Sequence, residues 1–241
     1  MIIAFQGAEH KVGTTMIAQS FAEVLAKEET GERILLLLFS TNRGRNYIKD
    51  DLGMEYLSKH IPLLIENKFD NEDIYNGCWN EGNLFIFGGI DRRYKLHDFY
   101  PDMAQKIIDA AKDQFKHIII DAGATLDFGL SMPAILNITD SYYYILDQSE
   151  SSINEMIDIK SYFKKYLLNP KGYIINRYDE EDIYTLKYIA NRLNVEQDQL
   201  LKLPEIPKSR KMEVDRTTFV KGKDKVFTKA MTTMVNDITQ R

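Results

Sequence analysis

A loop near the N-terminus carries residues that could bind phosphate. An apolar run over residues 1–5 precedes the loop at 7–13, and a helical pattern follows from Thr15. Backbone N–H groups in such a loop, together with a helix N-terminus, attract anions. The standard spacing ends in glycine, lysine and then serine or threonine, which binds magnesium. Here Gly13 is followed by Thr14 in the lysine position and Thr15 in the magnesium-hydroxyl position, while Gly7 stands one residue before the expected earlier glycine, where Ala8 lies.

Asp121 is a further residue that could take part in chemistry at this loop. It ends the apolar run HIIID and is followed by Ala122 and Gly123. We expect it beside the loop, where its carboxylate could contact a ligand or Mg²⁺ together with Thr15. Structural alternatives stay open: Gly13 as a turn glycine, Thr15 as a helix N-cap and Asp121 as a loop cap.

Short apolar runs alternate with helical patterns along the chain. This alternation predicts an α/β fold with a doubly wound, mostly parallel seven-stranded sheet and helices on both faces. Residues 1–241 are expected to form a single domain, with the polar stretch 67–83 as an insertion between the second and third strands. Expected strands are 1–5, 34–39, 84–87, 117–121, 142–146, 173–176 and 201–206, and expected helices are 15–27, 103–115, 151–167, 181–193 and 224–238.

Composition excludes several classes of protein. The 241 residues carry a net charge of −5, which argues against wholesale coating of nucleic acid. A single cysteine, Cys78, excludes an internal disulfide framework. The longest strongly apolar run covers residues 34–39, far short of the roughly 20 residues that span a bilayer, so we expect no transmembrane segment. No signal peptide is evident, and a cytoplasmic protein is expected, with a peripheral place at the membrane or cell pole left open.

Four segments in register resemble the ParA/MinD superfamily of deviant Walker A ATPases, a SIMIBI class of P-loop NTPase. They are VGTTMIAQSFAEVLA, ILLLLF, HIIIDAG and YIINR. The Val-Gly-Thr-Thr run looks most like the TadZ/CpaE pilus-assembly branch, whose loops often lack the usual lysine. The resemblance implies an ATP or ADP site with Mg²⁺, which could also stand empty. It implies a nucleotide site formed by Lys11, Val12, Gly13, Thr14, Thr15, Met16, Asp121, Asn176, Arg177 and Pro204, with Thr15 and Asp121 at the metal.

Within this resemblance Asp121 matches the Walker B aspartate and Asn176 the residue used against adenine, although Asn176 could equally be a buried, satisfied amide. Pro204 matches the start of the loop beside the base. The resemblance also implies a homodimer with a protein partner from a secretion, pilus or partition system.

The same resemblance identifies what the chain lacks. The phosphate lysine is Thr14, and the second lysine, which reaches across the family's dimer, falls on Glu9. The acidic residues after the second strand fall on Phe39 and Thr41. Phosphoryl transfer depends on positioning and on neutralising charge, and a close charge pair is worth roughly 1–4 kcal/mol. We therefore expect weak or absent hydrolysis, unless Lys11 replaces part of the lost charge.

The C-terminal segment 208–229 carries a net charge of +5, so the rest of the chain carries −10. Its basic surface could be a solvated face, or it could meet DNA, anionic lipid or an acidic partner. The helical pattern that follows has an apolar stripe and is expected to pack on the sheet. The basic residues are Lys208, Arg210, Lys211, Arg216, Lys221, Lys223, Lys225 and Lys229.

Two functions compete. The leading hypothesis is a localisation or assembly factor that uses the nucleotide fold as a scaffold. The alternative is an active ParA-like partitioning ATPase that binds DNA through its basic segment. A tyrosine autokinase fits poorly because the last tyrosine is Tyr188, and a nitrogenase iron protein type fits poorly because Cys78 stands alone.

Overall fold

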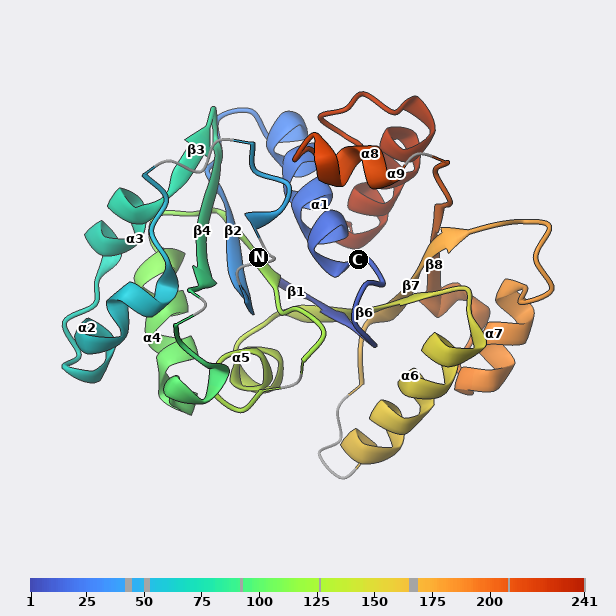
Figure 1. The fold of residues 1–241 in the computed structure, drawn as a ribbon, viewed down its shortest axis with the longest axis horizontal. Coiled ribbons are helices and arrows are strands. Elements are labelled where there is room, and N and C mark those ends of the chain that lie inside the picture. The colour runs from blue at the N-terminus through green and yellow to red at the C-terminus, as the bar shows by residue number, and fades with distance from the viewer. Residues whose placement is uncertain are drawn as a thin grey trace.

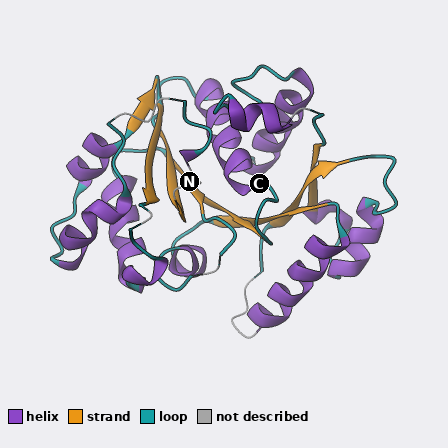
Figure 2. Cartoon of the chain, viewed as in Figure 1, coloured by secondary structure: helices purple, strands orange, loops and turns teal. Residues whose placement is uncertain are grey.

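The computed structural model describes residues 1–41, 45–49, 53–91, 93–125, 127–164, 169–207 and 209–240. Strands and helices alternate along most of this length, as Figures 1 and 2 show. The strands are β1 Ile2–Gly7, β2 Ile34–Thr41, β3 Trp79–Glu81, β4 Leu84–Ile90, β5 His117–Asp121, β6 Ser141–Asp147, β7 Gly172–Tyr178 and β8 Leu200–Pro204. The helices are α1 Thr14–Glu28, α2 Ile61–Ile65, α3 Asn71–Gly77, α4 Pro101–Lys112, α5 Ser131–Asn137, α6 Glu150–Phe163, α7 Leu186–Leu193, α8 Ser209–Val214 and α9 Lys225–Thr239. Short 3₁₀ turns lie at Leu57–His60, Leu96–Asp98 and Gln197–Gln199.

The sheet follows the order β3-β4-β2-β5-β1-β6-β7-β8. Every neighbouring pair is parallel except β3 with β4, which is antiparallel. The predicted doubly wound α/β fold is confirmed. The expected count of seven strands was wrong, because the described sheet has eight.

The additional strand comes from the polar stretch 67–83. Asp70 caps α3 by accepting the N–H groups of Glu72 and Asp73, and Asp73 accepts the Asp70 N–H in return. A turn at Gly82, whose φ is +63°, then lets β3 fold back along β4. These local signals are short, so the polar composition concealed a helix and an edge strand.

Two hydrophobic layers cover the sheet. One face of the central strands packs against α1 and α9, and the opposite face packs against α4, α5, α6 and α7 (Figure 1). The strands are apolar on both sides, as a covered parallel sheet requires. The apolar stripe of the last helix is buried in the first layer, as expected from sequence; its members are Phe227, Met231, Met234, Val235 and Ile238.

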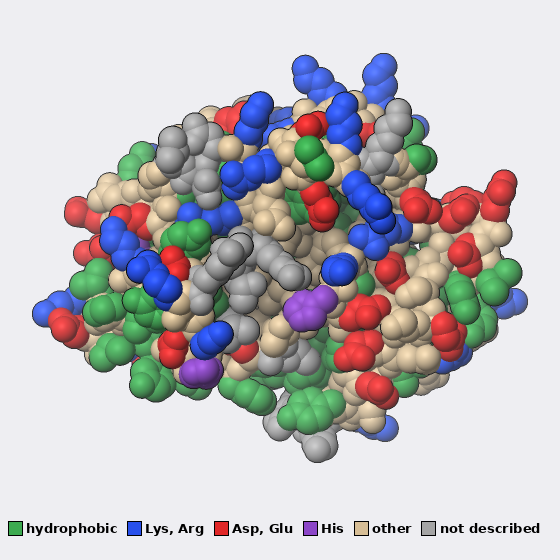
Figure 3. All heavy atoms as spheres, viewed as in Figure 1, with side chains coloured by type: hydrophobic (Ala, Val, Ile, Leu, Met, Phe, Trp, Pro, Cys, Tyr) green, Lys and Arg blue, Asp and Glu red, His purple; other side chains and the backbone are tan. Residues whose placement is uncertain are grey.

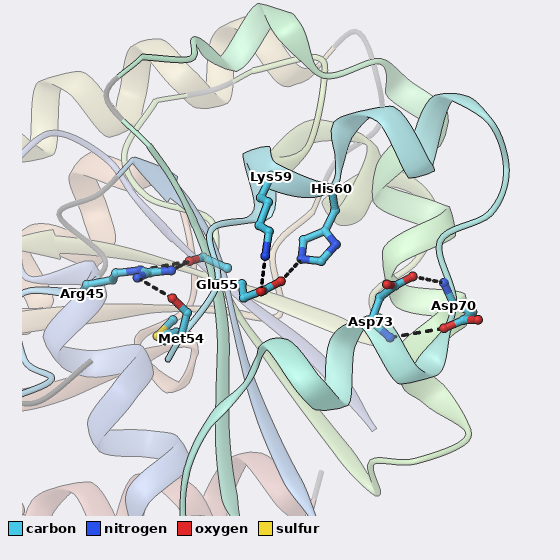
Figure 4. A network of polar contacts seen from close by, with 8 residues as sticks. Arg45, Met54, Glu55, Lys59, His60, Asp70 and Asp73 are labelled. Carbon is cyan, nitrogen blue, oxygen red and sulfur yellow. Dashed lines mark hydrogen bonds and ion pairs between the residues drawn. The ribbon is translucent and has the colours of Figure 1, made fainter. Parts of the chain in front are cut away.

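Residues 45–49 are held in place by a buried arginine (Figure 4). Arg45 is 4% exposed, and its guanidinium donates to the Gly88 carbonyl at 3.2 and 2.9 Å and to the Met54 carbonyl at 3.1 Å. The guanidinium also lies over the Tyr56 ring, 3.6 Å from its centroid. This arrangement ties residues 45–49 to the end of β4, which is the second strand from one edge of the sheet.

Candidate functional site

The N-terminal loop lies between the end of β1 and the start of α1, at the carboxyl edge of the parallel strands. Ligands bind at this edge in open α/β sheets. Gly13 is the N-cap of α1 with φ +95°, and the first helical bond runs from the Ile17 N–H to the Gly13 carbonyl at 3.0 Å. The N–H groups of Thr14, Thr15 and Met16 precede that bond and form the positive end of the helix.

The backbone of the loop takes a conformation that normally favours glycine. Lys11 has φ +73°, and its side chain is exposed. Val12, at 1% exposure, anchors the loop in the layer beneath α1. A left-handed lysine costs of order 1–3 kcal/mol, so the surrounding contacts must hold it in place.

Thr15 and Asp121 meet, as the sequence predicted. The Thr15 hydroxyl donates to Asp121 Oδ2 at 2.8 Å, across α1 and β5. Asp121 is fully buried, and the Gly123 N–H donates to its Oδ1 at 3.0 Å. Burial raises the pKa of Asp121, while the hydrogen bonds from Thr15, Gly123 and Ser40 oppose that rise. Thr15 is therefore not the N-cap, and Asp121 does more than cap its own loop.

Ser40 is a third member of this group, and no sequence motif marks it. Its hydroxyl donates to Asp121 Oδ2 at 3.1 Å from the end of β2. The acidic positions of the resemblance fell instead on Phe39, which is fully buried in the layer on the other face, and on Thr41. The sequence signal that could have identified Ser40 is its place as the first polar residue after the apolar run of residues 34–39. Residues 42–44, which continue this segment, lie outside the described residues.

The lysine position is occupied by a side chain directed into the loop. Thr14 is 7% exposed, and its Oγ1 lies only 2.4 Å from where a Cβ on Gly7 would stand. Glu9, at the position of the second lysine, accepts a hydrogen bond from the Ser151 hydroxyl at 3.5 Å. The loop thus carries neither of the two cations that the resemblance would place there.

The end of β7 holds the loop from the side. The Asn176 amide donates to the Val12 carbonyl at 2.8 Å, and its nitrogen fills the space that a Cβ on Gly13 would need. Arg177 donates to the Lys11 carbonyl at 2.8 Å and lies 3.6 Å from the Asp147 carboxylate. Asn176 is a buried amide with a partner on the loop, so its use against adenine stays a prediction.

Two other predicted site residues, Met16 and Pro204, are not among the described residues that hydrogen-bond to Asp121. Met16 is a buried residue of the first turn of α1. Pro204 is partly exposed at the end of β8, which β6 and β7 separate from β1. The oxygen donors of Thr15, Ser40 and Asp121 suit a hard cation such as Mg²⁺, which prefers carboxylate, hydroxyl and water oxygens. The helix terminus beside them suits a phosphate. The residues present therefore fit a magnesium nucleotide.

Comparisons with solved structures give the class to which this fold corresponds. A ParA family ATPase from Chlorobium tepidum TLS superposes with a TM-score of 0.83 at 16% identity, covering 97% of this chain and 96% of the other. The septum site-determining protein MinD complexed with Mg-ADP, from Pyrococcus horikoshii OT3, gives 0.75 at 21% identity, covering 98% and 95%. A putative plasmid partition protein from Borrelia burgdorferi B31 bound to AMPPNP gives 0.72 at 16%, covering 99% and 98%.

The chain therefore has the fold of the ParA/MinD ATPases, over almost its whole length. No family model matches the sequence, and a search of curated proteins gives no significant match. Among the described residues, no helix is both long and apolar enough to cross a membrane.

Proposed function

We propose that this protein binds an adenine nucleotide with Mg²⁺ at the loop of residues 7–15 and hydrolyses it weakly or not at all. The observation that carries the proposal is the contact of Thr15 with buried Asp121 beside a helix terminus where Thr14 replaces the phosphate lysine. The metal would supply charge at the phosphates. The chain supplies the helix N-terminus for the anion and the Asp121 carboxylate for the cation.

Loss of hydrolysis follows from charge. A transferred phosphoryl group spreads negative charge over its oxygens, and catalysis consists largely of positioning and neutralisation. Thr14 offers a neutral hydroxyl, and Glu9 adds a negative charge near the same loop. Two missing charge interactions of roughly 1–4 kcal/mol each remove several powers of ten in rate. Lys11 and Arg177 are exposed cations at this loop that could recover part of the lost charge.

A nucleotide that is bound but barely turned over serves as a structural ligand. In our proposal the chain is a localisation or assembly factor of a pilus, secretion or partition system, nearest to the TadZ/CpaE branch, and works as a homodimer with a protein partner. Solved proteins of the same fold include a MinC:MinD cell division complex from Aquifex aeolicus, which supports a protein partner. A cytoplasmic place, peripheral at the membrane or cell pole, fits this role.

One observation favours the alternative of a DNA-binding partition ATPase. Cations cluster over α8 and α9, at the top of the view in Figure 3. The exposed ones among the described residues are Arg210, Lys211, Lys223, Lys225 and Lys229. Two others are engaged internally: Arg216 donates to the Arg45 carbonyl, and Lys221 pairs with Glu81 over the Trp79 ring. Lys208 lies outside the described residues.

Calorimetry with MgATP and MgADP tests the leading proposal on wild type and on Asp121→Asn, which keeps the side chain's shape. We expect saturable binding that the substitution weakens, with ATP turnover near background. Turnover well above background, abolished by Asp121→Asn, would favour the active ATPase. Salt-sensitive DNA binding that requires ATP would support the partition alternative. The absence of DNA binding at low salt would exclude that alternative.

A further inference from the structure

The end of β2 presents Ser40 between Phe39 and Thr41, the two positions where the family resemblance would place acids. Ser40 lies on the face of the sheet that meets the N-terminus of α1, as does Asp121, while Phe39 lies on the opposite face. Residues alternate between the faces of a strand, so Phe39 and Ser40 cannot exchange roles without a shift of register. Among the side chains of β2 that the structure describes, Ser40 hydrogen-bonds to Asp121.

The contact of Ser40 with Asp121 belongs to a set of hydrogen bonds that engages both carboxylate oxygens. Asp121 Oδ2 accepts two hydroxyl hydrogen bonds, from Thr15 at 2.8 Å and from Ser40 at 3.1 Å. Oδ1 accepts the Gly123 N–H at 3.0 Å. Gly123 has φ +70°, and a Cβ there would stand 3.1 Å from the Ser40 Cβ. Glycine at 123 therefore lets the chain fold back on Asp121 and leaves room for the serine.

Such a contact has a defined effect on a metal site. A carboxylate near a cation must present a chosen oxygen at a chosen angle, and the groups that hydrogen-bond to it set that orientation. Thr15 is expected at the metal itself, so its hydroxyl would serve the cation when Mg²⁺ is bound. Ser40 would then be the hydroxyl that holds Asp121 Oδ2 from the side of β2.

We propose that Ser40 is a positioning residue for the Mg²⁺ that accompanies the nucleotide, acting through its hydrogen bond to Asp121 Oδ2. This inference rests on the proposed nucleotide site. In this inference the neutral hydroxyl of Ser40 orients the Asp121 carboxylate. The sequence of β2, ILLLLFST, contains no carboxylate that could orient an attacking water.

The test compares nucleotide binding by calorimetry in Mg²⁺ and in EDTA for wild type, Ser40→Ala and Ser40→Thr. Ser40→Ala should weaken binding in Mg²⁺ by about 10-fold to 100-fold and leave binding in EDTA unchanged. Ser40→Thr keeps the hydroxyl and should restore most of the loss. Mn²⁺ binding to the nucleotide complex, followed by electron paramagnetic resonance, should show the same order among the three proteins.

A buried serine elsewhere supplies the matched control. Ser58 is 1% exposed, and its hydroxyl accepts the Asp91 N–H at 3.2 Å, so Ser58→Ala also removes a partly buried hydrogen bond. It should leave the Mg²⁺ dependence intact. Equal losses in Mg²⁺ and EDTA, or unchanged Mg²⁺ dependence in Ser40→Ala, would overturn the inference while the nucleotide site stands. Failure of wild type to bind nucleotide would instead overturn the proposed function, and the role of Ser40 with it.

Discussion

Thr14 is the residue at which this loop departs most from one that neutralises phosphate charge. Its hydroxyl lies over Gly7 and its side chain is 7% exposed, so the space beside the backbone is filled without a cation. We expect Thr14→Lys to tighten MgATP binding by about 1–4 kcal/mol, because it returns a positive charge to the phosphates. Calorimetry at low and high salt measures the gain, with Thr30→Lys, in an exposed turn, as control. Equal affinity for the variant and wild type would show that the phosphates lie elsewhere.

Glu23 is a buried carboxyl that should make stability depend on pH. It is 3% exposed on α1, where the Gln19 amide and the Thr218 hydroxyl donate to it. Burial raises its pKa above the ordinary value, and the two hydrogen bonds offset only part of that rise. The folded chain therefore holds this proton to higher pH than the unfolded chain, and stability falls as pH rises through the folded pKa.

Glu23→Gln should remove this dependence on pH. The free energy of unfolding of the variant relative to wild type should increase as pH rises from about 4 to about 8, since only wild type must ionise a buried group. Urea unfolding at a series of pH values measures the difference, with exposed Glu32→Gln as control. A constant difference across the series would contradict the assignment.

At the scale of elements, β7 and the loop before α1 are coupled through Asn176 and Gly13. Gly13→Ala would place a Cβ 2.4 Å from the Asn176 amide nitrogen at φ +95°. Gly31 has φ +113° with nothing within 4 Å of a Cβ, so Gly31→Ala measures the backbone strain alone. We expect Gly31→Ala to cost of order 1 kcal/mol in urea unfolding and Gly13→Ala clearly more, with loss of nucleotide binding. Equal losses of unfolding free energy in the two variants would show that the Asn176 side chain moves aside without destabilising the fold.

The elements of the fold could largely be predicted, because a covered parallel sheet demands apolar runs. β5 lies at 117–121 as predicted, and α9 buries the stripe expected of it. The helix expected over 181–193 begins only at Leu186, where Thr185 caps it. β3 and α3 escaped prediction because a three-residue edge strand and a capped two-turn helix leave little periodicity to detect.

The candidate site was predictable only where a sequence motif marks it. Thr15 with Asp121 followed from the phosphate-loop spacing and the end of a buried strand, and the structure brings them together. Ser40 depends on which face of β2 reaches the site, and the hold of Asn176 on Val12 depends on how the loop folds back. Both contacts join residues that are far apart in the sequence, so no local motif predicts either contact.

At the scale of the whole molecule, charge should govern assembly. The fold is that of the ParA/MinD ATPases, and the resemblance to them places a lysine at position 9 that reaches across a dimer. In the homodimer that we propose, Glu9 reverses that charge and would weaken pairing through facing loops. Glu9→Lys should therefore lower the protein concentration needed for ATP-dependent dimerisation, as sedimentation velocity would measure. Glu28→Lys, exposed at the far end of α1, changes net charge equally and should not. Identical behaviour of the two variants would contradict this account.

The most direct test of the central claim identifies the nucleotide that the protein retains. Purified protein is incubated with ATP and Mg²⁺ for several hours, separated from free nucleotide, and its bound nucleotide is identified by chromatography. We predict that wild type retains ATP largely unhydrolysed and that Asp121→Asn retains much less. Accumulation of ADP that depends on Asp121 would identify an active ATPase, and retention of no nucleotide at all would show that this loop is not a nucleotide site.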